Sequence, residues 1–204
     1  MENFKIGQSS LEVAQIIVRN FSKIIGIKLI SHEVGINWRQ LHKDPRDKIR
    51  NVSNALQHPK PIREVELSRK NFLDLKLTDL EQLPEDQVWS LTSKVVCQDG
   101  IDKHIPMMNF HPHGISLEDI VVAIKVICNK EKGVILQSGR FFHYYGNSLL
   151  SEGDWMKFML DFLMPCVLVS PRYIGHRLSN KYCTLRLTTD SKYNKVIPRV
   201  IKLM

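Results

Sequence analysis

A short apolar run that stops at a glycine constrains the fold of this chain more than any other feature. Residues 134–136, Val-Ile-Leu, predict a buried strand that ends at Ser138-Gly139, and Arg140 and His143 follow at once among aromatic residues. Because Gly139 allows a tight turn, backbone N–H groups could point at an anion, and Arg140 could bind phosphate oxygens in a fork. The pattern is that of a phosphate-binding turn or, equally, of a strand end with a buried, hydrogen-bonded histidine.

The order of the predicted elements indicates a mixed sheet. Helices are expected to begin at Ser9, Asp44, Ser116 and Ser151, each a residue type that caps helices. The first of these carries apolar residues at helical spacing as far as Ile24 and Ile25, and the second runs to Leu56. Strands are expected at residues 64–69, 73–77, 104–110, 134–136, 167–169, 182–188 and 196–203, with a polar stretch at 80–94 and a turn at 98–100.

This order divides the chain into two parts. Residues 1–60 are expected to form a helical N-terminal extension, which could belong to the core or dock a protein partner. Residues 61–204 are expected to form an α/β (α+β) domain with a mixed sheet. Ligand sites in such sheets tend to lie where strands end.

The excess positive charge is concentrated near the C-terminus. The formal net charge is +8, and residues 171–204 hold eight Lys or Arg against one acid, Asp190. A localised basic surface attracts polyanions by counterion release, and nucleic acid is the commonest such partner. A solubilising tail is the alternative.

Other features bear on the compartment. No apolar run reaches the length of a membrane span, and the first residues lack the order of a signal peptide, so we expect a cytoplasmic protein without membrane contact. The four cysteines form no Cys-x-x-Cys pair and are expected to be reduced thiols: Cys97, Cys128, Cys166 and Cys183.

Three predicted strand ends carry polar side chains. Strand alternation places Asn109 and His111, and with them His113, on one face of the first. The second is the turn at residues 138–143, where the adjacent Tyr144 and Tyr145 could stack on bases but are expected in the core. The third is the basic stretch at residues 170–177, with Arg186 on the strand behind it.

These segments resemble a family over residues 62–204. Ser138-Gly139-Arg140-Phe141-Phe142-His143 resembles the second motif of archaeo-eukaryotic primases, also called primase-polymerases. Residues 170–177 and 185–187 resemble their third motif and the hairpin after it, most closely those of small bacterial primase-like proteins. The resemblance implies the primase-polymerase fold and a nucleotidyltransferase activity, which would serve a process such as DNA replication.

The resemblance also implies roles for residues. Asn109, His111 and Ser170 occupy the positions of metal-binding catalytic acids, where Mg²⁺ or Mn²⁺ would activate a 3′-hydroxyl and hold a nucleotide triphosphate. Of these three, His111 alone is a usual metal ligand. Contacts with nucleotide phosphates or single-stranded DNA or RNA are expected from Ser138, Gly139, Arg140, His143, Arg172, His176, Arg177 and Arg186.

The chain departs from the family pattern at the positions where metal binding needs negatively charged side chains. Asn109 and Ser170 are neutral where aspartates are expected, and Mg²⁺ prefers carboxylates. Two such replacements favour natural divergence over one engineered substitution. We therefore expect phosphate binding with weak or no nucleotidyl transfer and, in that case, no metal cofactor.

Three other interpretations stay open. Substitute metal ligands such as Asp102, Glu118 or Asp119 could keep a primase active. The chain could instead be a non-enzymatic nucleic-acid-binding adaptor. Alternatively, His111-Pro112-His113 could hold zinc in a metal-dependent hydrolase, although such barrels usually need a longer chain and more ligands.

Overall fold

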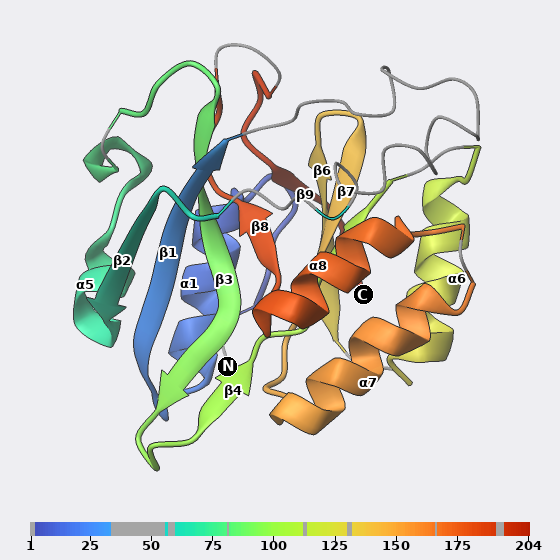
Figure 1. The fold of residues 1–204 in the computed structure, drawn as a ribbon, viewed down its shortest axis with the longest axis horizontal. Helices are drawn as coiled ribbons and strands as arrows, with labels where there is room; N and C mark the ends of the chain where they lie inside the picture. The colour runs from blue at the N-terminus through green and yellow to red at the C-terminus, as the bar shows by residue number, and fades with distance from the viewer. Residues whose placement is uncertain are drawn as a thin grey trace.

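Two antiparallel sheets, built from segments far apart in the sequence, organise the chain (Figure 1). The computed structural model describes residues 3–33, 56, 60–80, 82–111, 114–129, 132–165, 167–190 and 194–204. Apart from Leu56, the helix expected at residues 44–56 lies outside the described residues, as do His113 and Cys166. The expected α/β (α+β) class is confirmed, but the expected mixed sheet is instead two sheets whose described pairings are all antiparallel.

The first sheet contains strands from the N-terminal, central and C-terminal parts of the chain. Its strands, in the order in which they pair, are β2 (Arg63–Ser68), β1 (Ile24–Glu33), β3 (Gln87–Cys97) and β4 (Asp102–His104). The short strand β8 (Thr184–Arg186) also pairs with β3, beside β4. The C-terminal basic segment thereby joins the same edge of β3 as β4 does, opposite β1.

The second sheet holds the Ser-Gly turn. Its strands, in the order in which they pair, are β5 (Met107–Phe110), β7 (Phe141–Gly146), β6 (Gly133–Ser138) and β9 (Arg199–Leu203). The expected strand at 104–110 is therefore two strands, interrupted at Pro106, which has no N–H to donate to a ladder.

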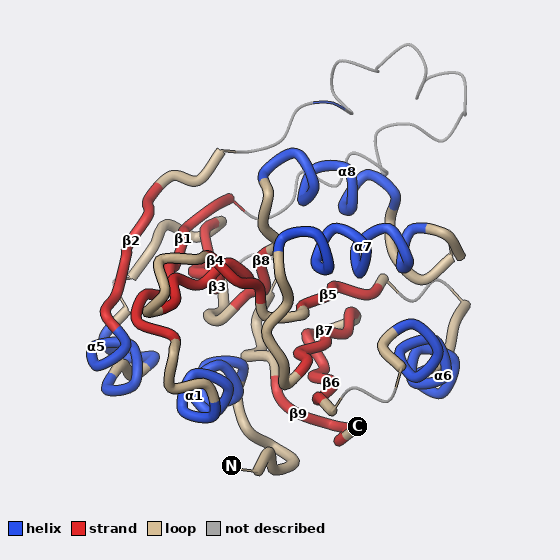
Figure 2. The backbone as a smooth tube through the Cα atoms, turned by 90° about the horizontal axis from the view of Figure 1, so that it is seen from below, coloured by secondary structure: helices blue, strands red, loops and turns tan. Residues whose placement is uncertain are grey.

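Helices cover both sheets (Figure 2). The described helices are α1 (Ser10–Asn20), α5 (Arg69–Asp74), α6 (Leu117–Ile127), α7 (Glu152–Leu163), α8 (Pro171–Asn180) and the 3₁₀ turn η1 (Leu77–Asp79). Ser9, Ser116 and Ser151 cap α1, α6 and α7, as predicted, because each hydroxyl accepts a backbone N–H of the first turn. In Figure 2, α7 and α8 lie side by side while α6 flanks the second sheet; α1 and α5 lie by the first.

The expectation of an entirely helical section before residue 60 is wrong at residues 24–33, which form β1. Ile24 and Ile25 fit the helical spacing of α1, but the helix ends at Asn20 and the chain then enters the first sheet between β2 and β3. Arg69 stabilises this ending, because its guanidinium donates to the carbonyls of Val18 and of Phe21, the latter at 3.0 Å. Cations at a helix C-terminus also interact favourably with the helix dipole.

Two further expectations fail for identifiable reasons. The strand expected at 73–77 is wrong, because the Ser68 hydroxyl accepts the Asn71 N–H at 3.2 Å and begins α5 instead. The polar stretch at 80–94 contains most of β3, whose small polar residues are buried: the Thr92 hydroxyl donates to the Lys28 carbonyl at 3.0 Å. Buried hydroxyls that are hydrogen-bonded in this way hide a strand from a hydrophobicity pattern.

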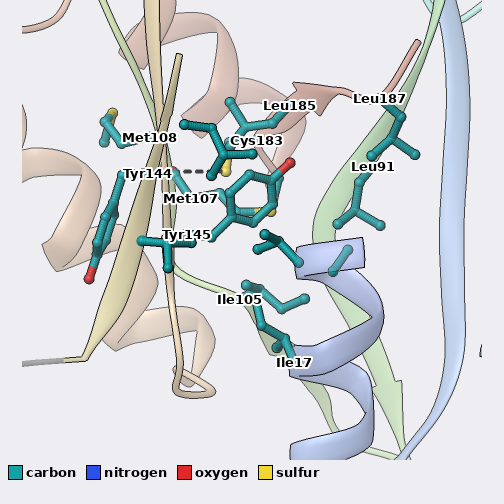
Figure 3. Close-up of a cluster of buried hydrophobic side chains, with 14 of the residues drawn as sticks. Ile17, Leu91, Ile105, Met107, Met108, Tyr144, Tyr145, Cys183, Leu185 and Leu187 are labelled. Atoms are coloured by element: carbon teal, nitrogen blue, oxygen red, sulfur yellow. Dashed lines mark hydrogen bonds between the residues drawn. The ribbon is translucent and has the colours of Figure 1, made fainter. Parts of the chain in front are cut away.

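One part of the hydrophobic core lies between the two sheets, and another lies on the opposite face of the second sheet (Figure 3). Tyr145 and Met107 of the second sheet point toward Leu185 of β8 and Cys183 just before it, and the Cys183 thiol donates to the Met107 carbonyl at 3.3 Å. Tyr144 points to the opposite face. Both tyrosines are fully buried, so their assignment to the core is confirmed.

Two further observations concern the described residues. Cys97, Cys128 and Cys183 form no disulfide there. None of the helices that the structure describes is long and apolar enough to span a bilayer.

Replacing Arg69 with Met should destabilise the protein by about 1–3 kcal/mol, because several carbonyls at the end of α1 lose a charged donor. Urea denaturation measures the change. Lys70→Met is the matched control, since Lys70 is the exposed neighbour. Equal effects of the two substitutions would contradict the capping role.

The stability of the protein should fall on acidification through His104. This side chain is buried, stacks on Trp155 with ring centroids 4.5 Å apart and contacts the Ser93 hydroxyl at 3.2 Å. Burial, with a smaller effect of Lys94, lowers the pKa of His104 from 6.5 to about 4.

The unfolded chain therefore binds a proton at His104 below about pH 6.5, which the folded protein takes up only near pH 4. The contribution of His104 to the free energy of unfolding should fall as the pH is lowered from about 6.5 to about 4, and should be constant above pH 6.5. Urea denaturation from pH 7 to pH 4.5 should give a shallower decline for His104→Phe, which keeps a stacking ring. Identical declines would show that His104 does not contribute.

Candidate functional site

The Ser-Gly turn joins two paired strands. β6 and β7 form an antiparallel hairpin in which Ser138 lies opposite Phe141, so Gly139 and Arg140 are the two turn residues. Gly139 has φ +66°, a conformation that glycine adopts without strain. Both turn residues are exposed, whereas Ser138 is buried. The sequence predicted the turn, and the structure adds that the aromatic run after it is a strand.

Asn109 and His143 lie side by side on neighbouring strands. β5 pairs with β7 so that these two residues are direct partners, and Leu136 of β6 is the partner of His143 on its other side. The His143 side chain is only 4% exposed. Within the described residues, Asn109 Oδ1 and His143 Nδ1 are buried atoms without a hydrogen-bond partner. Such atoms are uncommon in folded proteins and mark sites where a ligand or water can bind.

His143 is neutral at physiological pH. Burial lowers its pKa from 6.5 to about 3, and the positive charges of Arg186 and, to a smaller extent, His111 act in the same direction. The imidazole can therefore offer one donor and one acceptor but no charge. Any charge that attracts a phosphate to this hairpin must come from other residues.

Arg186 connects the hairpin to the other sheet. Its guanidinium donates to Ser138 Oγ at 2.8 Å, to the Thr188 carbonyl at 2.6 Å and to the Val196 carbonyl at 2.8 Å. The residue is 7% exposed. The phosphate contact of Arg186 stays a prediction, and these protein groups already occupy the guanidinium.

Phe141, at the end of the hairpin, stacks on the His111 ring and makes a cation–π contact with Arg140. The His111 and Phe141 rings lie 4.3 Å apart at an angle of 23°, and the Arg140 guanidinium carbon is 4.9 Å from the centre of the Phe141 ring. Contacts of this kind orient an arginine at modest energetic gain. Phe141 is a site residue that the sequence did not single out, although its place directly after Arg140 was a usable signal.

The third segment meets the first at the start of α8. The His111 N–H donates to the Leu168 carbonyl at 3.2 Å, two residues before Ser170. The strand expected at 167–169 is wrong: Ser170 is the N-cap of α8, followed by Pro171, although its hydroxyl makes no capping hydrogen bond. Proline in the first helical turn explains why a helix begins there.

Helix α8 carries the basic residues of the third predicted segment. Arg172, His176 and Arg177 are all half-buried. The Arg177 guanidinium carbon lies 5.1 Å from the centre of the Tyr173 ring. Burial raises the pKa of Tyr173, while Arg177 and the backbone of Asn109 act in the opposite direction. The structure thus brings parts of all three predicted segments together.

The acids that could replace the missing carboxylates have other roles. Asp102 forms an ion pair with Lys94 at 2.6 Å. Asp119 completes the capping box of α6 with Ser116, and Glu118 lies in the same first turn. Across the described ranges, no group of three or more His, Cys, Asp or Glu side chains is placed to hold a metal ion.

Comparisons with known proteins bear on the whole site. A family model described as "AEP-like: Archaeo-eukaryotic primase 1D-like" matches residues 69–199. This span includes every candidate site residue and excludes α1, β1 and β2. Neither the search of curated proteins nor that of solved structures gives a match.

Replacing Gly139 with Ala should destabilise the protein by about 1–2 kcal/mol, because the turn requires a left-handed backbone. Steric crowding is not the cause, since an added Cβ meets no atom within 4 Å. The control is Gly153→Ala in α7, where φ is not positive and the nearest atom to an added Cβ is Ser151 Oγ at 4.0 Å. Chemical denaturation should show the control to be neutral or stabilising; a loss at both positions would refute the backbone explanation.

Proposed function

Since the chain belongs to the archaeo-eukaryotic primase-like family, we propose that it binds the phosphates of nucleotides and of single-stranded nucleic acid, with weak or no nucleotidyl transfer. One observation carries this proposal. Asn109 and His143 lie side by side, each with a buried polar atom that has no hydrogen-bond partner among the described residues, while neither they nor Ser170 supply the negative charge that a two-metal site needs.

The residues at the family's metal-binding positions do not fit Mg²⁺ or Mn²⁺. Asn109 offers a neutral amide, Ser170 a hydroxyl and His111 an imidazole. Hard divalent ions are held by carboxylates and waters in octahedral geometry. The positive charge of Arg186, which already lowers the pKa of His143, further disfavours a cation nearby. No catalytic step through a metal ion follows from this set of residues.

The charges around the hairpin suit an anion. Arg140 is exposed at a turn whose glycine lets backbone N–H groups approach a ligand, and Arg172 and Arg177 lie on α8. Arginine binds phosphate through paired, charge-assisted hydrogen bonds. The excess charge of residues 171–204 would favour a long polyanion over a single phosphate. These features support a single strand as the macromolecular ligand.

The alternative functions gain less support. An active primase would need substitute carboxylates, and Asp102, Glu118 and Asp119 lie in an ion pair and in the first turn of a helix. A zinc hydrolase would need several ligands near His111, and the part of the chain that the structure describes holds no such group. A non-enzymatic adaptor uses the same basic surface and differs from our proposal only in the partners it joins.

Primer extension tests the proposed loss of chemistry. The unmodified protein should give no extended product with Mg²⁺ or Mn²⁺, because losing even one preorganised charge contact typically costs about 10²–10³ in rate. The double variant Asn109→Asp with Ser170→Asp restores both expected acids and should show more product than either single variant. Robust synthesis by the unmodified protein would refute the inactive-site part of the proposal.

Salt-dependent binding tests the phosphate contact. Affinity for a labelled single-stranded oligonucleotide should fall with salt, and Arg140→Ala should weaken it and reduce the slope of log K against log salt by about one. Lys70→Ala on α5 removes the same charge at the far edge of the first sheet and should leave the slope unchanged (Figure 1). A slope unaffected by Arg140→Ala would show that this residue does not contact phosphate.

A further inference from the structure

The geometry points to Arg186 as a positioning residue, which fixes the hairpin turn by clamping Ser138 to the two carbonyls beyond β8 instead of contacting phosphate itself. This inference rests on the proposed function, because it states what holds the phosphate-binding turn in place. It departs from the expectation that Arg186 is a phosphate contact.

The three partners of Arg186 come from separate segments. Ser138 ends β6 in the second sheet, Thr188 follows β8, and Val196 precedes β9. Because the Arg186 backbone pairs with Ser90 of β3 in the first sheet, its side chain joins the two sheets. Planar guanidinium groups hold several acceptors in fixed directions, which a lysine ammonium does not.

Burial leaves Arg186 little capacity for a second partner. The side chain is 7% exposed, and burial lowers its pKa to about 10 although Asp190 opposes this, so it stays charged at neutral pH. A charged group with this little solvent contact depends on its hydrogen bonds, and releasing them to bind phosphate would leave Ser138 and two carbonyls unsatisfied. Arg140 differs, because it is exposed at the turn itself.

The clamp acts directly beside the turn of the hairpin, where Ser138 also pairs with Phe141 and the Gln137 side chain donates to the Gly139 carbonyl at 3.3 Å. Ser138 is the last residue of β6, and the exposed turn follows it directly. The bond from Arg186 fixes the strand end one residue before Gly139, so the direction in which Arg140 leaves the turn depends on it. Losing the clamp should therefore reduce affinity without changing the number of phosphate contacts.

Oligonucleotide binding at several salt concentrations separates positioning from contact. Arg186→Met and Arg186→Lys should each weaken binding about tenfold or more with an unchanged salt slope, since a bond from a charged donor is lost in both. Ser138→Ala removes the acceptor alone and should weaken binding in the same way. A slope reduced by about one in Arg186→Met, as expected for Arg140→Ala, would overturn the inference and assign a direct contact.

Amide hydrogen exchange tests the clamp independently of any ligand. Exchange at residues 138–141 should accelerate about tenfold or more in Arg186→Met and Ser138→Ala, while exchange in β3 stays unchanged. Ser148→Ala is the matched control, because the Ser148 hydroxyl is also buried but has no hydrogen-bond partner in the part of the chain that the structure describes. Arg199→Met controls for loss of an arginine, since Arg199 is exposed on β9 and donates to the Gly7 carbonyl at 2.9 Å.

These measurements distinguish two kinds of failure. Absence of salt-dependent binding by the unmodified protein would refute the proposed function, and hydrogen exchange alone would then decide whether Arg186 holds the turn. Unchanged exchange at residues 138–141 in both variants would refute the clamp. If Arg186→Met fails to fold, Arg186→Lys and Ser138→Ala still decide the question, because the first keeps the charge and the second leaves Arg186 intact.

Discussion

The antiparallel pairing of β5 with β7 is the constraint on which the candidate site depends. Its register makes Asn109 the direct partner of His143, and the adjacent pairing of β6 with β7 places Ser138 opposite Phe141. A shift of one residue would turn His143 to the other face, toward the side where Phe110 packs on Phe162 of α7. The same register therefore sets both the burial of the imidazole and its distance from Arg186.

In this arrangement the positive charges lie around the site while the side chains at its centre are neutral, which suits anion binding better than metal-dependent catalysis. The chain belongs to the family and three segments converge near Asn109, but the side chains of Asn109, His143 and Ser170 are neutral at physiological pH. The cationic groups lie around this centre: Arg140 is on the exposed turn, and Arg172 and Arg177 are on α8. An anion can gain from such an arrangement, whereas a divalent cation would meet an amide, a hydroxyl and a nearby guanidinium. On our proposal, neutral residues at the positions of the expected acids change which ligand the same backbone favours.

Local signals explain what could be predicted from the sequence. The serine caps of α1, α6 and α7 and the turn at Gly139 depend on residues a few positions apart, and each was predicted correctly. β1 was missed because Ile24 and Ile25 also fit a helix, and the competing strand pairs with residues 63–68. Likewise, the proximity of Asn109 to His143 follows from strand register. The hydrogen bonds of Arg186 depend on the burial of its side chain. Its place in a segment where basic and apolar residues alternate does not indicate that burial.

Titration of a nucleoside triphosphate by calorimetry, with excess chelator and again with Mg²⁺, tests the central claim most directly. A neutral, metal-free site predicts measurable binding in chelator, with a Kd that Mg²⁺ changes by no more than about threefold, a difference of well under 1 kcal/mol. Binding that appears only with the divalent ion would contradict the account, because it would require carboxylate ligands that Asn109 and Ser170 cannot provide.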